Sequence, residues 1–365
     1  PGPPIGWERM SPVLRSSVVA ALLYEGMADT EDEARDMAAR GGVVFAPAHE
    51  HLAVCPAAGV ISPSMPVLII KNETYNNFTY CTFFEGGGLV TLDRLNWVEK
   101  VLAPVIRQAV AAAGGVDLRD IIAQALHMGD QGHYQTTAAT ALFIRTLAPY
   151  MVRTCPNREM LSQILFFLDS QPSFFQNLAL AAVKSALDAA HGVPGSRIVT
   201  VMAHNGADFG LQVSGLDDEW FTVPIEPPDG LFMPGYSRLD AHPIIGDSAL
   251  IETYGWGAFA LAGTPAAVPL LGGSVEGAIQ ITRDMYRITV GESTVLTLPA
   301  LDMRGAPTGI DVRRVADTGI PPWMHVEIIH REPGRGPIGV ALWQPPLEPF
   351  IRAAQAFDRG AQNDG

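Results

Sequence analysis

Apolar segments of helical length, separated by short runs rich in glycine and proline, constrain the middle of this chain most strongly. From Asp93 to His191 the apolar residues recur with the period of an α-helix that buries one face. The segments are separated by four short helix-breaking sequences: Gly114-Gly115, Gly129 to Gly132, Pro156-Asn157 and Gln171-Pro172. Because glycine and proline end helices, the pattern predicts five helices in a helical subdomain over residues 93–192.

The flanking regions mix helical and extended patterns. Helices are predicted where apolar periodicity follows a cap or a proline: Pro12 to Met27, a helix capped by Thr30 that stops at Gly41-Gly42, Asp247 to Ala262, and Val275 to Thr289. Strands are predicted where β-branched and aromatic residues cluster: Val43 to Phe45, Pro66 to Ile70, Phe78 to Phe84, Arg197 to Ala203, Phe209 to Val213 and Met324 to Ile329. At 365 residues the chain is long for one core. We therefore expect a mixed α+β fold with three domains, 1–92, 93–192 and 193–365.

Charge argues against two classes of partner. The chain carries a net charge of −14, whereas nucleic acids and anionic membrane surfaces attract basic proteins. We therefore expect no nucleic acid and no membrane as a partner. Lysine occurs only at Lys71, Lys100 and Lys184, so most basic residues are arginines. Because a guanidinium suits carboxylate and phosphate, small anionic substrates are compatible with this composition.

The number of cysteines and the apolar runs indicate the cellular compartment. Three cysteines are too few, and odd in number, for a disulfide framework, which fits a reducing cytoplasm. The most apolar long run, Ala249 to Gly273, contains Glu252 and several glycines, so it is predicted to be a buried helix and not a membrane span. Residues 1–10 lack the apolar core of a signal peptide. Because the chain begins without methionine in the middle of a motif, we expect an upstream segment.

His49, Glu50 and His51 form the first candidate catalytic cluster. In extended backbone, His49 and His51 point to one face and Glu50 to the other. Two neighbouring imidazoles suit general acid–base chemistry or a metal ion. The alternative is that they are structural histidines, hydrogen-bonded in a turn. The sequence places no third ligand beside them, and we predict neither a metal nor a cofactor.

Asp130 and His133 lie three positions apart, before a helix predicted to begin near Thr136. Free backbone N–H groups at a helix N-terminus favour an anion, and an acid beside an imidazole can move protons. We expect both residues to be catalytic. The alternative is that Asp130 and Thr136 only cap the helix.

Further polar residues at the ends of apolar segments are candidate substrate ligands. Glu85 precedes three glycines that allow a close backbone approach, although the sequence there is no P-loop. For Glu85 the alternative is a simple turn. Asn205 follows a predicted strand, and Asn205-Gly206 is a strong turn dipeptide that pairs the strands 197–203 and 209–213 as a hairpin. Asp247 begins a predicted helix, where the structural alternative is an N-cap. Because no GxSxG elbow is present, Ser248 and Ser274 are poor candidate nucleophiles.

A second group of candidate ligands lies near the C-terminal end of the chain and is rich in arginine. Its members are Arg304, Thr308, Asp311, His330, Arg331 and Arg335. Because His330 and Arg331 end an apolar strand beside glycine-rich backbone, we expect this group to bind the anionic parts of a substrate. The alternative is that its arginines are ordinary surface residues.

Several longer motifs resemble those of one family and extend from Gly2 to about Pro346. They are GPPIGWERM at 2–10, ALLYEG at 21–26, HEH at 49–51, ISPSMP at 61–66, DAAHG at 188–192, GDS at 246–248, PTGID at 307–311 and HREPG at 330–334. On these motifs the chain resembles the YlbE/AllG family, long described as conserved proteins of unknown function.

The resemblance implies an enzyme subunit. Members of the family usually carry an upstream Rossmann-like segment. AllG is taken to be one subunit of oxamate carbamoyltransferase, acting with AllF (FdrA) and AllH in allantoin catabolism. That enzyme interconverts oxalurate plus phosphate with oxamate plus carbamoyl phosphate. We therefore expect a carbamoyltransferase subunit in an oligomeric assembly, acting on small anionic substrates.

The working hypothesis assigns binding to arginines and proton transfer to histidines and acids. Arg304 and Arg331 hold phosphate and carboxylate, and an imidazole of the His-Glu-His motif donates to the carbamoyl oxygen. The glutamate of that motif, or Asp130, orients the amide nitrogen or takes its proton. His133 is a second acid–base group.

One segment departs from the family pattern, in which Met-Gly-Asp is followed by Glu and then by a polar stretch rich in Asn and Arg. Here residues 131–137 read QGHYQTT. If this segment lines the pocket, the substrate has changed, and an amide hydrolase or another acyltransferase is an alternative function. A further alternative is a non-catalytic scaffold subunit that binds a partner.

Overall fold

The computed structural model describes residues 1–83, 90–133, 135–264 and 273–363. Helices and strands follow one another without a regular alternation, which confirms the predicted mixed α+β class. The chain begins with two packed helices, α1 (Pro12–Tyr24) and α2 (Glu31–Ala39). Both were predicted, and both begin at a side-chain cap: the Ser11 and Thr30 hydroxyls accept hydrogen bonds from the backbone of the first turn.

A small sheet follows, made of β1 (Ala53–Val54), β2 (Val67–Asn72) and β3 (Asn77–Thr82). The strand order is β1-β3-β2, with β3 parallel to β1 and antiparallel to β2. The predicted strand at 43–45 is wrong. Val43 and Phe45 instead pack against the α1–α2 cluster, where Phe45 stacks on Trp7, and Val44 between them is 94% exposed.

The predicted five helices are confirmed in the described part of the 93–192 region. The first runs from α3 (Leu92–Trp97) through a π-helical turn into α4 (Ala103–Ala113). The others are α5 (Leu118–His127), α6 (Thr137–Thr154), α7 (Arg158–Ser170) and α8 (Phe175–Ala189). Gly114, in the left-handed region at φ 78°, ends α4 at the predicted break.

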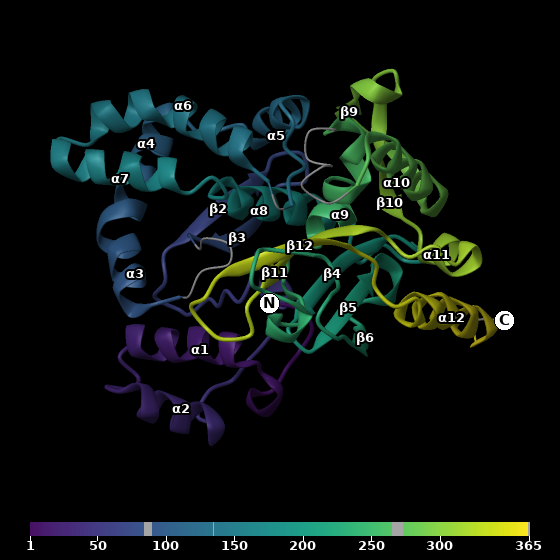
Figure 1. Ribbon diagram of the computed structural model, residues 1–365, viewed down its shortest axis with the longest axis horizontal. Helices are drawn as coiled ribbons and strands as arrows, with labels where there is room; N and C mark the ends of the chain where they lie inside the picture. The colour runs from purple at the N-terminus through teal and green to yellow at the C-terminus, as the bar shows by residue number, and fades with distance from the viewer. Residues whose placement is uncertain (84–89, 134, 265–272, 364–365) are drawn as a thin grey trace.

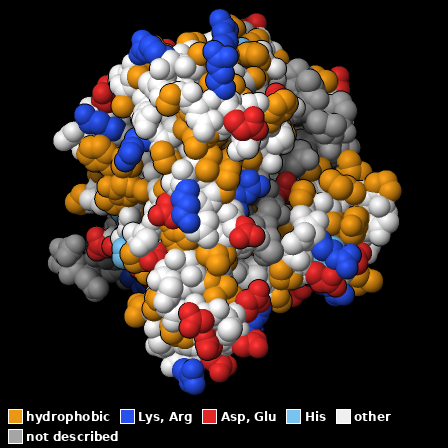
Figure 2. Space-filling view, turned by 90° about the vertical axis from the view of Figure 1, so that its left-hand side faces the viewer, with side chains coloured by type: hydrophobic (Ala, Val, Ile, Leu, Met, Phe, Trp, Pro, Cys, Tyr) orange, Lys and Arg blue, Asp and Glu red, His pale blue; other side chains and the backbone are white. Residues whose placement is uncertain are grey.

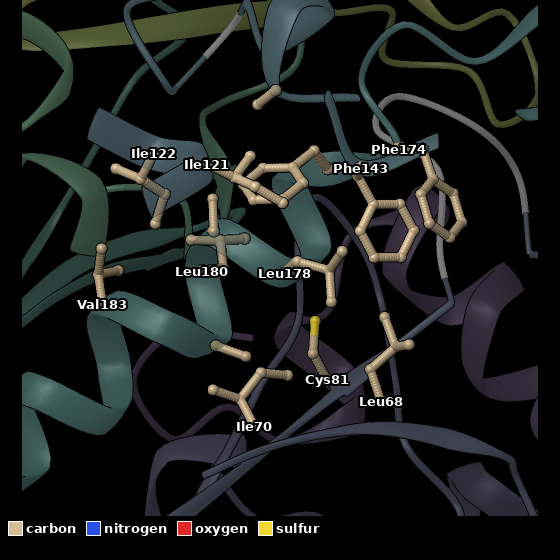
Figure 3. Packing of buried hydrophobic residues seen from close by; sticks show 14 of the residues in the cluster. Leu68, Ile70, Cys81, Ile121, Ile122, Phe143, Phe174, Leu178, Leu180 and Val183 are labelled. Carbon is tan, nitrogen blue, oxygen red and sulfur yellow. The ribbon is translucent and has the colours of Figure 1, made fainter. Parts of the chain in front are cut away.

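Helix α8 packs on the β2–β3 face and carries the centre of the core. Figure 3 shows Leu178 of α8 between Cys81 and Leu68 of the sheet and Phe143 of α6. The same hydrophobic cluster includes Leu250 and other residues from beyond 192, so apolar packing crosses all three expected domains. The domain boundaries stay a prediction.

The C-terminal half is built from small antiparallel sheets flanked by helices (Figure 1). Its elements are β4 (Val199–Asn205), β5 (Asp208–Val213), β6 (Phe221–Pro224), β7 (Leu231–Phe232), β8 (Ile245–Gly246), α9 (Leu250–Tyr254), α10 (Val275–Ile288), β9 (Thr289–Leu298), β10 (Arg304–Ile310), α11 (Val312–Thr318), β11 (Met324–Ile329), β12 (Pro337–Trp343) and α12 (Glu348–Asn363). The strand orders are β6-β5-β4-β8, β11-β12-β7 and β10-β9. The predicted β4–β5 hairpin, helix α10 and strand β11 are confirmed.

The single helix expected over 247–262 is wrong. Helix α9 ends at Gly255, whose φ of 105° suits glycine, and a 3-10 segment, Gly257–Gly263, follows. A Cβ on Gly255 would lie 2.4 Å from the Pro307 carbonyl oxygen, so strand β10 is packed directly against the break. The bend leaves Glu252 fully buried on α9.

Two further findings concern apolar segments and thiols. Among the described residues, no single helix is long and apolar enough to cross a membrane. Residues 92–113 and 118–127 together meet those criteria only as a pair bent by 98°. Cys55, Cys81 and Cys155 are buried and unbonded to one another.

Candidate active site

A small pocket of about 40 Å³ lies where three parts of the fold meet. Strand β11, the start of α8 and the turn around β8 each contribute to its wall. The polar side chains that line it are His133, Ser173, Gln176, Ser248 and Glu327. The remaining lining residues are alanine, isoleucine and valine, so polar and apolar side chains share the wall about equally.

His133 is held in place by a buried carboxylate. Its Nδ1 lies 2.7 Å from Oε2 of Glu252, whose side chain has no solvent exposure. Oε1 of Glu252 accepts hydrogen bonds from the backbone N–H groups of Ala258 at 3.1 Å and His325 at 3.2 Å. A carboxylate beside Nδ1 fixes the proton on that nitrogen. The Nε2 atom, which makes no hydrogen bond within the described residues, is then the basic nitrogen of a residue that lines the pocket.

Glycines permit this close packing. Gly132 has φ 84°, and a Cβ there would lie 2.3 Å from the ring of Trp256. Gly257 has φ 59°, and a Cβ there would lie 2.1 Å from Oε1 of Glu252. Backbone at both positions therefore approaches a buried side chain more closely than any other residue type allows. The loop after α5 and the break after α9 bring His133 and Glu252 together across 119 residues of sequence.

Side-chain amides complete the surroundings of His133. The Gln131 carbonyl oxygen accepts from the His133 backbone N–H at 3.0 Å, and the Gln131 amide nitrogen lies 2.6 Å from Nδ1 of His325. Gln176, at the start of α8, donates to the His133 carbonyl oxygen. His133 is thus fixed through its ring, its N–H and its carbonyl group, and it cannot turn away from the pocket without breaking several bonds.

Glu327 is the acidic group of the pocket. It lies on β11, between the apolar residues Val326 and Ile328, and its carboxylate accepts no hydrogen bond from the described residues. Burial raises the pKa of Glu327 to about 7, and the charge of His133 opposes that rise. Glu327 keeps some solvent exposure although protein surrounds its carboxylate, as expected for a residue that lines a pocket.

Asp130, the other predicted acid near His133, faces a helix end and is not among the pocket-lining residues. Its Oδ2 accepts the backbone N–H of Ala139 at 2.7 Å, in the first turn of α6. Burial raises its pKa to about 6, against the lowering effect of the hydrogen bonds from α6. The geometry matches the capping alternative for Asp130.

Asp247 and His49 form a second buried cluster. The Asp247 carboxylate accepts from Nε2 of His49 at 3.0 Å and from the backbone N–H groups of Gly2 and Cys55, each at 2.7 Å. Burial alone would raise the pKa of Asp247, but the charge and hydrogen bond of His49 and the Gly2 N–H hold it well below its usual range. Asn205 adds a bond from its amide nitrogen to the Pro3 carbonyl oxygen at 3.1 Å. Asp247 therefore ties the N-terminal segment to the turn that carries Ser248.

The His-Glu-His motif is a 3-10 turn, Ala48–His51, and the extended interpretation of it is wrong. Only His49 is buried; Glu50 and His51 are exposed. The turn closes at Leu52, a non-glycine residue in left-handed backbone at φ 55°. The two imidazoles therefore do not face a common ligand. Within the described residues no three His, Cys, Asp or Glu side chains converge as a metal site.

The arginine-rich group does not line the pocket. Arg304 pairs with Glu292 at 2.6 Å and stacks over the Tyr286 ring at 3.7 Å. Arg331 is exposed. Figure 2 shows basic and acidic side chains interspersed on the face in view, with no continuous basic patch.

The polar members of that group have local structural partners. Thr308 donates to the Tyr254 carbonyl oxygen at 2.5 Å, Asp311 caps α11, and Nδ1 of His330 accepts the backbone N–H of Glu332 at 2.9 Å. Asp311 also pairs with Arg197 at 3.0 Å. Glu85, the remaining predicted ligand, lies outside the described residues.

Comparison with known proteins identifies the family of this chain. The family model described as "Oxamate carbamoyltransferase subunit AllG" matches residues 43–248. The AllG subunit of Escherichia coli K12 that bears the same description is 38% identical to this chain, over 98% of this chain and 88% of its own length. The chain belongs to the AllG family. The resemblance seen in the sequence motifs is thereby confirmed.

Two other relatives extend the comparison. The E. coli K12 protein described as "Uncharacterized protein YahG" is 42% identical over 96% of this chain and 76% of its own length. A crystal structure of a conserved protein of unknown function from Enterococcus faecalis V583 superposes with a TM-score of 0.94 at 42% identity, covering 98% of this chain and 88% of that one. The AllG-family fold of this chain is therefore seen in an experimental structure too.

Two acidic residues of the site were missed in the sequence, although each carried a signal. Glu252 is an acidic residue inside an apolar run, and its presence there argues against a membrane span. Glu327 interrupts the apolar alternation of a predicted strand. An isolated acid in an apolar segment is costly to bury unless it is paired or functional, and that reasoning would have singled out both residues.

Proposed function

We propose that this chain is a subunit of a carbamoyltransferase that moves a carbamoyl group between a ureido or oxamate-type acid and phosphate. One structural observation supports this assignment independently of the family name. A histidine with its Nδ1 fixed by a buried carboxylate faces a small pocket, which is the arrangement that general acid–base catalysis requires. Family membership and the name of the 38% identical AllG subunit support the reaction class.

The pair His133–Glu252 would act on the nitrogen atom that gains or loses the carbamoyl group. In the synthetic direction, the oxamate nitrogen attacks the carbonyl carbon of carbamoyl phosphate, and phosphate leaves with the electrons of the C–O bond. The attacking nitrogen gives its proton to Nε2 of His133, and the product is oxalurate. In the reverse direction the protonated imidazole returns that proton to the leaving nitrogen. Glu252 stabilises the imidazolium in both directions.

Phosphate recognition would require residues from another chain. Carbamoyl phosphate and oxamate are anions, yet within the described residues no lysine or arginine lines the pocket. An anion in a poorly solvated site needs cationic or N–H donors. We therefore assign those donors to partner subunits of the AllF (FdrA) and AllH kinds, and we expect turnover from the assembly and not from this chain alone.

A reconstitution experiment tests this proposal. Carbamoyl phosphate consumption with oxamate is measured for this chain alone, for the partner subunits alone, and for the co-expressed assembly, with the ureido product identified by mass spectrometry. The proposal expects oxalurate only from the complete assembly. Turnover by the partner subunits without this chain would show that it is a scaffold. Product from a different ureido acid, with none from oxamate, would show that the substrate has changed.

A further inference from the structure

The pocket offers hydrogen-bonding groups that no described residue uses. The Glu327 carboxylate, the side-chain oxygen of Gln176 and the hydroxyls of Ser173 and Ser248 make no hydrogen bonds within the described residues, and the same is true of Nε2 of His133. Most of these groups are acceptors, or hydroxyls that can accept. A ligand that satisfies them must bring several N–H donors.

Charge narrows the class of ligand. An anionic group placed in this pocket would face the Glu327 carboxylate without any lysine or arginine among the described lining residues. Above its raised pKa of about 7 the Glu327 carboxyl is ionised, and like charges in a desolvated site repel strongly, so the carboxylate or phosphate of a substrate is then disfavoured there. An uncharged amide does not meet this penalty.

The volume of the pocket restricts the ligand further. The pocket volume is about 40 Å³, and a water-sized position takes about 10–15 Å³ on this measure. A pocket of this size suits a small group such as a carbamoyl group, which has three non-hydrogen atoms. The rest of the ligand must lie towards the mouth.

We propose that this pocket is a subsite for the uncharged carbamoyl end of a ureido acid, with Glu327 accepting its N–H groups and the anionic end of the ligand held outside. The inference rests on the proposed function, since it states which end of the substrate this chain binds. It also accounts for the absence of arginine or lysine from the described lining residues, because the charged end lies where a partner subunit supplies the cations.

Ligand-observed saturation-transfer NMR tests the subsite without turnover. Methylurea, an uncharged carbamoyl compound, is compared with acetate, an anion of similar size, on the wild-type chain. At pH 8, above the pKa of Glu327, we expect saturation of methylurea, little of acetate, and about tenfold weaker methylurea binding in Glu327→Gln, because a charged acceptor is replaced by a neutral one. Glu219→Gln, at an exposed position, is the matched control and should bind as wild type does.

Two results would overturn the subsite: acetate saturating as strongly as methylurea on wild-type protein, or unchanged methylurea binding in Glu327→Gln. The wild-type comparison decides the question even if the variant does not fold. The outcomes also distinguish this inference from the proposed function. If methylurea binds but the assembly transfers no carbamoyl group, only the proposed function is refuted. If the assembly turns over but methylurea does not bind, only the proposed subsite is refuted.

Discussion

Replacing Glu252 by glutamine separates the proton chemistry of the site from its packing. The glutamine side chain has the shape of the glutamate, and its carbonyl oxygen can still accept from the backbone N–H groups of Ala258 and His325. Its NH₂ group then faces Nδ1 of His133, where a carboxylate oxygen lies 2.7 Å away in the wild type. An amide N–H can only donate, so Nδ1 becomes an acceptor and the proton moves to Nε2. His133 then loses the basic nitrogen that faces the pocket.

The substitution has separate expected effects on the rate and on stability. A positioned general acid–base group contributes roughly 10²–10⁴-fold to a rate, so we expect kcat of the assembled enzyme to fall about 1,000-fold in Glu252→Gln. This loss corresponds to about 4 kcal/mol in the barrier. Stability should change less than that, because the buried backbone donors keep an acceptor. Loss of one charge-assisted bond costs about 1.5–3 kcal/mol. Initial rates of carbamoyl phosphate consumption and urea denaturation of the same preparation give both quantities.

Two outcomes would refute this reasoning. A folded Glu252→Gln variant with kcat within about threefold of wild type would mean that the tautomer of His133 does not matter. A variant that unfolds outright would mean that Glu252 is needed for the fold beyond the single bond counted here. The exposed variant Glu219→Gln controls for assembly and assay.

Three further predictions concern stability and the N-terminal anchor. Gly132→Ala forces a Cβ to within 2.3 Å of Trp256 at a positive φ, so urea denaturation should show a loss of at least about 2 kcal/mol; a loss under 0.5 kcal/mol would contradict the close packing. Folding raises the pKa of Glu327 to about 7, so the unfolded chain ionises first. The unfolding free energy of wild type relative to Glu327→Gln should therefore fall by up to about 1.4 kcal/mol per pH unit from about pH 4.5 to 7 and then level off; a constant difference across that range would refute the raised pKa. Asp247→Ala leaves the N–H groups of Gly2 and Cys55 without their acceptor, and limited proteolysis should then release the first ten residues faster; unchanged cleavage would show that other contacts anchor this segment.

Local signals explain which elements could be predicted from the sequence. The capped helix α2 and the β4–β5 hairpin at Gly206 follow from a few neighbouring residues, so composition and spacing were sufficient. The failures came from tertiary contacts. Residues 43–45 have strand-like composition but pack against the helices α1 and α2. The apolar run after Asp247 is divided at Gly255, where strand β10 packs directly against the backbone.

The candidate site also depends on tertiary contacts that local sequence patterns do not reveal. His133 was predicted because it lies near Asp130, just before the start of a predicted helix. Its partner Glu252 lies 119 positions away, and no local pattern reports a contact that two separate turns create. The arginines were chosen by chemical type, yet Arg304 is neutralised by Glu292 on the neighbouring strand. Residue type alone could not show that pairing.

The rate of carbamoyl transfer by an assembly that contains His133→Ala tests the central claim most directly. Single-turnover rates are compared with those of assemblies containing wild type and His127→Ala, in which an exposed histidine on α5 is removed. The account predicts a loss of at least about 100-fold for His133→Ala alone, with the subunits still assembling. An equal rate for His133→Ala and His127→Ala would contradict it, and the acid–base chemistry would then have to be sought outside this pocket.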